Sequence, residues 1–344
     1  MPIFMIGTQR SGSNLLRLML NQLAEIAAPH PPHILQRMMP LEKGYGDLAK
    51  EKNFNQLVDD VCKLVEINPV PWEGVTLERK DIASRCRNHS VVAVFGAVYD
   101  AMAAQNKVKT WCCKSLANIN YLSDLEDYYG DEARYIYLYR DGRDVAVSFR
   151  KAVVGEKHPY HIAGEWAATQ RIALAQRKLI SPKRFFNLSY ETLTASPEKA
   201  MRGLCEFLGV AYTDTMLDFH ESSEAKSAAS SSDLWSNVVK PVMADNTNKF
   251  LREMTAEEIK IFELVAGDVL DALGYKRFQT KIGETKTFSA AEIKAFDAEN
   301  QRLKQEVLSK VDPEDMKRRD QQAALIKQIK DRQKQAEGSV TAKK

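Results

Sequence analysis

A glycine-framed turn near the start of the chain has the composition of a phosphate-binding loop. Gly7-Thr8-Gln9-Arg10-Ser11-Gly12-Ser13-Asn14 follows a short apolar run and precedes an apolar helical pattern. A turn of this kind presents backbone N–H groups to a tetrahedral oxyanion. The glycine spacing imitates a Walker A loop, but Ser13 replaces its lysine and Asn14 replaces its magnesium-binding hydroxyl. Because a cation is kept at Arg10, the loop suits an anionic donor whose leaving group is neutralised without a metal.

A second candidate anion site follows another apolar run. Residues 135–139 lead into Arg140-Asp141-Gly142-Arg143-Asp144, and Ser148 lies eight residues after Arg140. An arginine fork and a hydroxyl can together hold a phosphate monoester. Asp141 and Asp144 can cap the next helix and orient the arginines. A turn with Arg-Asp after a strand often has only a structural role. This segment therefore indicates phosphate binding only in combination with the first loop.

Together, the two loops resemble those of sulfotransferases that use 3′-phosphoadenosine-5′-phosphosulfate (PAPS). Residues 7–14 resemble the family's 5′-phosphosulfate loop, and residues 139–148 resemble its 3′-phosphate segment, with Arg140 and Ser148 at the family's separation. Cytosolic members usually have lysine where this chain has Arg10. This difference places the chain nearer to the tyrosylprotein, carbohydrate and bacterial branches.

Two further segments carry the same resemblance, in the family's order along the chain. Residues 187–193, followed by Pro197 and residues 206–209, look like the family's Tyr-Glu-x-Leu…Pro…Phe-Leu-Gly stretch. Lys240-Pro241-Val242 resembles the closing-loop motif of the tyrosylprotein type. The resemblance covers residues 1 to about 275. It implies a P-loop-like α/β fold, PAPS as co-substrate, its product PAP (3′-phosphoadenosine-5′-phosphate), and no metal.

The resemblance also implies a role for each matching residue. Arg10 would neutralise the bridging oxygen of the phosphosulfate, and Arg140 and Ser148 would hold the 3′-phosphate. Tyr190 would lie near the adenine, although a core aromatic is the alternative, and Lys240 could reach the nucleotide from the closing segment. The residues that would cradle the 5′-phosphosulfate are Ser11, Gly12, Ser13 and Asn14.

Sulfuryl transfer also needs a cation at the reacting centre and a base for the acceptor's proton. Lys114 ends a predicted strand at the sheet edge of Arg10, where the tyrosylprotein branch has a lysine. It could stabilise the transition state; a solvated strand-end lysine is the alternative. Related enzymes often carry a catalytic glutamate after the first helix, but no acid lies between Glu25 and Glu42. The candidate bases are therefore His30, which fits that place slightly better, and His33.

These residues need a scaffold, and the pattern of the chain predicts a parallel sheet flanked by helices. Short apolar runs alternate with amphipathic ones, and each predicted strand ends in a polar loop. The predicted strands are residues 2–6, 109–113, 133–139 and 183–188. The predicted helices are residues 13–26, 46–66, 77–106, 116–129, 143–154, 160–180 and 255–273. A Ser-rich stretch at 212–250 reads as a long surface segment that could close over a ligand.

Charge and composition divide the chain into a sulfotransferase domain at 1–280 and a charged helical extension at 285–344. The extension holds 14 Lys/Arg against 10 Asp/Glu, out of a net charge of +3 for the whole chain, so the body is nearly neutral. We expect the extension to be a solvated appendage, an oligomerisation element or a partly disordered tail. A nearly neutral body argues against nucleic acid or a membrane surface as partner. Five cysteines without metal-ligand spacing, and no signal peptide, predict a cytoplasmic protein.

The sequence therefore predicts a sulfotransferase that moves the sulfuryl group of PAPS to an acceptor hydroxyl or amine by in-line displacement. The neutral body mildly favours a small metabolite as acceptor, and a carbohydrate or a protein is the alternative. A P-loop kinase is a further alternative, which the missing Lys-[Ser/Thr] pair opposes. A catalytically dead nucleotide-binding module is the weakest reading, because a cation set and a histidine pair surround one sheet edge.

Overall fold

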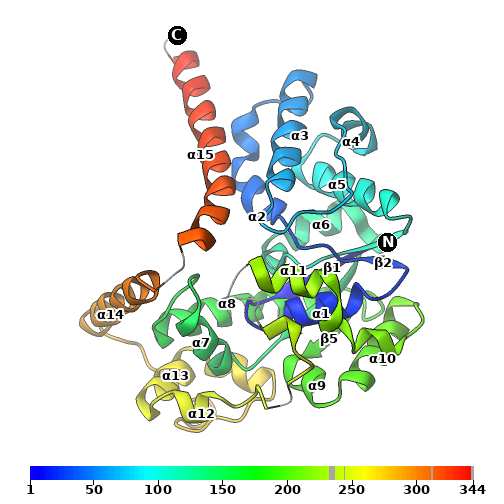
Figure 1. Ribbon diagram of the computed structural model, residues 1–344. Helices are drawn as coiled ribbons and strands as arrows, with labels where there is room; N and C mark the ends of the chain where they lie inside the picture. Colours follow the sequence, from blue (N-terminus) through cyan, green and yellow to red (C-terminus); the bar gives the residue numbers. More distant parts are fainter. Residues whose placement is uncertain (232–236, 244, 311–312, 342–344) are drawn as a thin grey trace.

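The computed structural model describes residues 1–231, 237–243, 245–310 and 313–341, which fold around a five-stranded parallel sheet. The strand order is β2-β3-β1-β4-β5, and all four neighbouring pairs are parallel. Helices cover both faces of this sheet (Figure 1), which confirms the predicted P-loop-like α/β architecture. The strands are β1 (Pro2–Gly7), β2 (Ile26–Ala27), β3 (Thr110–Cys113), β4 (Arg134–Tyr139) and β5 (Phe185–Ser189).

The helices follow the predicted pattern, with local differences. Sequence reasoning missed the short β2 and the helices α2 (Ile34–Met38), α9 (Tyr190–Ala195), α10 (Pro197–Leu208) and α12 (Phe250–Glu253), and the stretch predicted as a surface segment contains α11 (Ser223–Ser231). The pattern at 77–106 is two helices, α4 (Arg79–Arg85) and α5 (Val91–Gln105). The other α-helices before the extension are α1 (Ser13–Leu20), α3 (Glu51–Glu66), α6 (Leu122–Tyr129), α7 (Gly142–Lys151), α8 (Pro159–Leu179) and α13 (Ala256–Ala272). Short 3₁₀ helices are η1 (Met39–Tyr45), η2 (Leu116–Tyr121), η3 (Gly130–Glu132), η4 (Asp214–Met216) and η5 (Phe219–Glu221).

The central strand β1 is apolar on both faces because helices bury both of them. Phe4 and Ile6 pack in a core with α3 and α5, whereas Ile3 and Met5 pack in a second core with α1 and α10. All four side chains are fully buried. A strand buried on both faces is typical of a parallel sheet, since crossover helices cover each side. A third core joins α7, α8 and α13 beside the sheet.

The register of the strands brings four loops to one edge of the sheet. Gly7 at the end of β1 pairs with Leu138 of β4, and Tyr139 at the end of β4 pairs with Ser189 of β5. The strand β3 ends at Cys113, which pairs with Phe4 of β1. Because all strands run in one direction, the loops that follow β1, β3, β4 and β5 lie at the carboxyl edge, where ligands bind in open α/β sheets.

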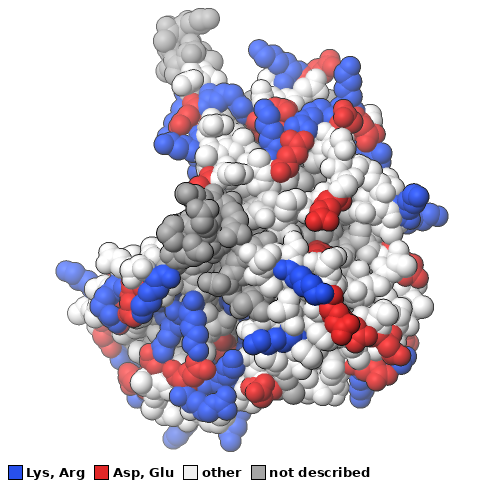
Figure 2. Space-filling view, in the orientation of Figure 1, with Lys and Arg blue, Asp and Glu red and all other residues white. Residues whose placement is uncertain are grey.

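The C-terminal extension forms two helices that pack against the domain. Helix α14 (Ala290–Leu308) contacts α7, and α15 (Pro313–Thr341) contacts α3 and η1, so the two lie beside different parts of the domain (Figure 1). Ile329 of α15 is fully buried in the core that includes α3. Lys and Arg alternate with Asp and Glu over the outer face near α14 (Figure 2). The extension is therefore helical and charged, as predicted, but it is attached to the body.

A buried ion-pair cluster anchors the start of α7. Arg143 donates to Asp141 Oδ2 at 2.7 Å and to Glu263 Oε1 at 2.6 Å, and all three side chains are almost completely buried. Glu263 also accepts backbone N–H bonds from Phe278, Gln279 and Thr280. The cluster thereby ties the segment after β4 to α13 and to the chain beyond it.

Removing the cation of this cluster should be costly. Arg143→Ala leaves two buried carboxylates without their partner, and we expect the free energy of unfolding to fall by about 3–5 kcal/mol. Arg171→Ala is the matched control, because its pair with Asp268 is exposed and should be worth at most about 1 kcal/mol. Urea denaturation followed by circular dichroism measures both. A similar loss in the two variants would contradict the prediction.

Candidate active site

The loop after β1 adopts a backbone that only glycine allows at two positions. Gly7 has φ 139°, and a Cβ on it would lie 2.1 Å from the carbonyl oxygen of Leu138. Gly12 has φ 88°, and its Cβ would lie 2.4 Å from the ring of Tyr190. Arg10 also has a positive φ, of 69°, which is uncommon outside glycine and turns the loop tightly over the start of α1. The glycines therefore let the loop approach both β4 and Tyr190 closely.

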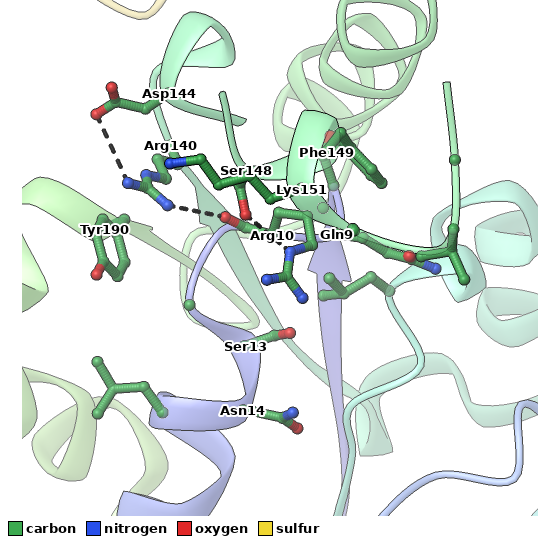
Figure 3. A pocket seen from close by; sticks show the side chains of 18 of the residues that line it. Gln9, Arg10, Ser13, Asn14, Arg140, Asp144, Ser148, Phe149, Lys151 and Tyr190 are labelled. Carbon is green, nitrogen blue, oxygen red and sulfur yellow. Dashed lines mark hydrogen bonds and ion pairs between the residues drawn. The ribbon is translucent and has the colours of Figure 1, made fainter. Parts of the chain in front are cut away.

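The two predicted anion segments meet above the start of α1. Arg10 Nε donates to Ser148 Oγ at 2.9 Å, and Arg140 Nη1 donates to the carbonyl oxygen of Arg10 at 3.2 Å. Figure 3 shows Arg10, Arg140 and Ser148 side by side, with Ser13 and Asn14 below them. Burial, together with the positive charge of Arg140, lowers the pKa of Arg10. Two cations in contact at a partly buried place are typical of a site for a polyanion.

Arg140 is held in position from several sides. Its guanidinium lies over the ring of Tyr190, 4.3 Å from the centroid, and donates to the carbonyl oxygen of Asn246 at 2.5 Å. The side chain of Asn246 in turn donates to the hydroxyl of Tyr190 at 2.7 Å. Trp166 Nε1 donates to the carbonyl oxygen of Arg140 at 3.2 Å. Sequence reasoning found Arg140 and Tyr190 but missed Asn246 and Trp166, which lie outside the recognisable motifs.

Lys114 reaches the same place from the end of β3. Its Nζ donates to Asn14 Oδ1 at 2.8 Å, and the residue is 8% exposed. Burial and the neighbouring cations Arg17 and Arg10 lower the pKa of Lys114 to about 7. Among the described residues, no carboxylate forms an ion pair with it. The alternative of a solvated strand-end lysine is thus wrong, and Lys114 belongs to the cation set.

The two candidate bases have different surroundings. His33 lines the cavity at the sheet edge, and its Nδ1 lies 2.9 Å from Ser115 Oγ. His30 is buried at 4% exposure, is absent from the described lining, and accepts from Asn68 and Trp72 through its carbonyl oxygen. Burial and the cations Lys114 and Arg37 lower the pKa of His33 to about 3, so it is neutral at physiological pH. The slight preference for His30 is therefore reversed.

A cavity of about 1160 Å³ joins these residues. Among the residues that the structure describes, nine Lys/Arg and three Asp/Glu line it. The three acids are Asp144, Glu165 and Glu306. Lys240 lines the cavity, as the closing segment predicts, although residues 232–236 and 244 of that segment lie outside the described part. Folding therefore concentrates positive charge that the composition of the body does not reveal.

Two buried polar atoms of the predicted anion-binding segments have no hydrogen-bond partner among the described residues. They are Arg140 Nε, whose residue lines the cavity, and Ser11 Oγ, whose residue is absent from the described lining. A buried donor without a partner costs about 1–3 kcal/mol, so Arg140 Nε calls for a ligand in the cavity. Both belong to segments that the sequence assigns to phosphate binding. The described residues contain no group of three His, Cys, Asp or Glu side chains able to hold a metal ion.

The fold and this site define an α/β transferase for an anionic donor. Residues 2–214 match a family described as "Sulfotransferase family", and the chain belongs to this family. Protein-tyrosine sulfotransferase 2 of Gallus gallus is 24% identical over 281 residues, 79% of this chain and 69% of the relative. Protein-tyrosine sulfotransferase A of Caenorhabditis elegans is 25% identical over 282 residues, 79% of this chain and 67% of the relative.

Solved structures share the fold. The sulfotransferase domain of the olefin synthase of Synechococcus PCC 7002 superposes with a TM-score of 0.52 at 20% identity, covering 76% of this chain and 94% of that domain. The sulfotransferase domain from the curacin biosynthetic pathway gives a TM-score of 0.50 at 21% identity, covering 80% and 97%. The match to the sulfotransferase family makes the protein an enzyme of the sulfotransferase type and decides against a P-loop kinase. Among the described residues, no helix has the length and apolar character needed to cross a membrane.

The lowered pKa of Lys114 predicts how the binding of PAP depends on pH. Below pH 7 Lys114 carries its charge in the free protein, and above pH 7 the charge is progressively lost. Since one charge-assisted contact then disappears, the affinity for PAP should fall by roughly ten- to a hundredfold between pH 6 and pH 9. Calorimetry at each pH measures this. In Lys114→Arg, whose side chain stays charged, the affinity should no longer depend on pH above 7; a parent protein with constant affinity would refute the prediction.

Proposed function

We propose that this sulfotransferase uses PAPS as donor. The observation that carries the proposal is the convergence of Arg10, Arg140, Ser148 and Lys114 on one cavity, where Arg140 Nε has no hydrogen-bond partner among the described residues. PAPS supplies a sulfuryl group on a phosphate that can leave. Arg140 and Ser148 would bind its 3′-phosphate, while the loop 10–14 would bind its 5′-phosphosulfate.

The cations would act on the charge that develops as the sulfur–oxygen bond to the donor breaks and the bond to the acceptor forms. Arg10 and Lys114 would stabilise the departing phosphate oxygen, a task that falls to magnesium in kinases. Neither has to move far, because Asn14 holds Lys114 and Ser148 holds Arg10. Positioning and electrostatics of this kind account for most of the catalysis of group transfer between oxygens.

His33 is the base that we propose for the acceptor's proton. The tautomer with its proton on Nδ1 donates to Ser115 Oγ and leaves Nε2 free to accept the proton of the acceptor. The negative charges of a bound donor would offset the cations around His33 and raise its pKa towards that of an effective base. In the free protein, burial and the neighbouring cations Lys114 and Arg37 keep the ring neutral.

We further propose that the acceptor is the hydroxyl of a tyrosine in an acidic protein segment. The argument for a small metabolite rested on a nearly neutral body, but the cavity itself is strongly basic. The donor accounts for only part of this charge, since Arg37, Lys151 and Lys249 also line the cavity. The names of the curated relatives, which are protein-tyrosine sulfotransferases, support the same acceptor class.

The donor assignment predicts selectivity for the 3′-phosphate. The parent protein should bind PAP more tightly than AMP, and Arg140→Ala should weaken PAP by about ten- to a hundredfold while changing AMP little. Arg140→Lys, which keeps the charge but loses the fork, should lie between them. Calorimetry provides these affinities, and transfer of sulfur-35 from labelled PAPS should survive EDTA. Equal affinity for PAP and AMP, or activity restored only by magnesium, would contradict the donor assignment.

The assignment of the base predicts an order among three variants. His33→Ala should lower kcat by about two to four powers of ten with little change in PAP affinity, as general base catalysis contributes that much. His30→Ala should change kcat far less, because that ring does not line the cavity. Glu165→Gln tests an exposed carboxylate of the cavity lining, whose pKa is raised by desolvation and by the charge of Glu156. Steady-state kinetics measure kcat for each variant, and titrations with PAP measure its affinity. If only Glu165→Gln loses kcat, Glu165 and not His33 is the base.

A further inference from the structure

One wall of the cavity comes from the C-terminal extension. Glu306, Val307 and Lys310, at the end of α14 and just beyond it, line the same cavity as Arg10 and Lys114. The part of the chain that matches the sulfotransferase family ends at residue 214. The extension therefore adds side chains to the active-site cavity that the family match does not cover.

Buried hydrogen bonds and an ion pair fix α14 in this place. Asn300, 4% exposed, accepts through Oδ1 from the backbone N–H groups of Lys157 at 2.8 Å and His158 at 3.0 Å. Lys304 pairs with Glu156 at 2.7 Å. These bonds attach α14 to the connection between α7 and α8. Since residues 151–155 of that connection also line the cavity, the helix and the lining segment are held together.

Aromatic packing reinforces this attachment. Phe296 of α14 stacks on the ring of His158, with centroids 4.6 Å apart, and lies 5.2 Å from the ring of Tyr160. Phe288, which precedes the helix, packs on both Phe296 and Tyr160. Ring contacts of this kind stabilise packing beyond the area that they bury. Helix α14 is therefore packed against the domain through these rings.

The second helix of the extension secures its other end. Gln322 of α15 donates to the carbonyl oxygen of Leu64 at 3.0 Å, and Arg332 forms an ion pair with the buried Asp60. Gln333 donates to the carbonyl oxygen of Leu41 at 3.0 Å. The extension is thus bound to α7 and α8 through one helix and to α3 and η1 through the other (Figure 1). An element attached on both sides keeps its position beside the cavity.

The wall that α14 presents adds one cation and one carboxylate to the cavity. Lys310 pairs with Glu306 at 2.9 Å, whereas Arg302 is paired mainly with Glu299, at 2.7 Å, and is absent from the described lining. The lining as a whole keeps its surplus of Lys and Arg, and Lys310 is the cation on the side of α14. We propose that the C-terminal end of α14 forms the acceptor side of the cavity and selects acceptors with an anionic group near the reacting hydroxyl. This inference rests on the proposed function and names the residues, Val307 and Lys310, that contact the acceptor.

A charge reversal tests the role of Lys310. The probe is a synthetic tyrosine peptide with flanking Asp and Glu, compared with the same peptide carrying Asn and Gln. Lys310→Glu should raise KM for the acidic peptide about three- to tenfold and leave the affinity for PAP and the KM of the neutral peptide nearly unchanged. Lys294→Glu is the matched control, because it makes the same charge change on an exposed part of α14 outside the described lining.

A labelling experiment tests the contact at Val307 without any turnover. The native cysteines are buried, apart from the partly buried Cys86, so a new surface thiol should react fastest with a maleimide. The acidic peptide with PAP should slow the labelling of Val307→Cys severalfold, and that of the control Ala295→Cys not at all.

The outcomes separate this inference from the proposed function. A parent protein that transfers no sulfate from PAPS to the peptide refutes the proposed function, whatever the labelling shows. Normal transfer by the parent, with the same KM in Lys310→Glu and unslowed labelling at position 307, overturns the inference about α14 and leaves the proposed function standing. Slowed labelling at position 307 together with a raised KM supports both.

Discussion

The main electrostatic constraint on the site is the repulsion among three cations that the sheet brings to the same edge. Arg10, Lys114 and Arg140 follow β1, β3 and β4, and a parallel sheet delivers all three to the same edge. Burial, and after it the neighbouring positive charges, lowers the pKa of Arg10 and, to about 7, that of Lys114. Such an arrangement costs free energy in the empty protein. The anionic donor proposed above would offset this cost by neutralising the three charges, so donor affinity and site geometry would depend on the same constraint.

Much of the fold could be predicted because its signals are local. The strands β1, β3, β4 and β5 are short apolar runs bounded by polar loops, and each was placed to within about two residues. The short β2 and α2 were not predicted, because segments of two and five residues show too little periodicity to be recognised. The division between α4 and α5 was also not predicted, although residues 87–90 are all polar and Ser90 caps α5.

The candidate site was predictable where a motif fixes both the residue and its backbone. Arg10, Arg140 and Ser148 meet as expected because their loops follow strands whose order is fixed by the sheet. The orientation of a histidine ring has no such local signal. His33 has a left-handed backbone, with φ 58°, at the start of α2, while the ring of His30 turns into the protein. The role of Asn246 could not be predicted either, because it depends on contacts with Arg140 and Tyr190, which are far away in the sequence.

The distribution of charge explains how a common donor site and a particular acceptor can coexist in one chain. The net charge of the chain is only +3, because positive and negative residues nearly balance. It therefore does not reveal the cavity, which has nine Lys/Arg and three Asp/Glu among its described lining residues. The cations that we propose to bind the donor follow strands of the sheet, where a change would also disturb the proposed phosphate contacts. If α14 selects the acceptor as proposed, that selection could change more freely, because α14 is held by its own contacts with residues 156–160. The donor side of the cavity is supported by the sheet and the proposed acceptor side by α14. Residues on the acceptor side could therefore vary while the chemistry on the donor side is preserved.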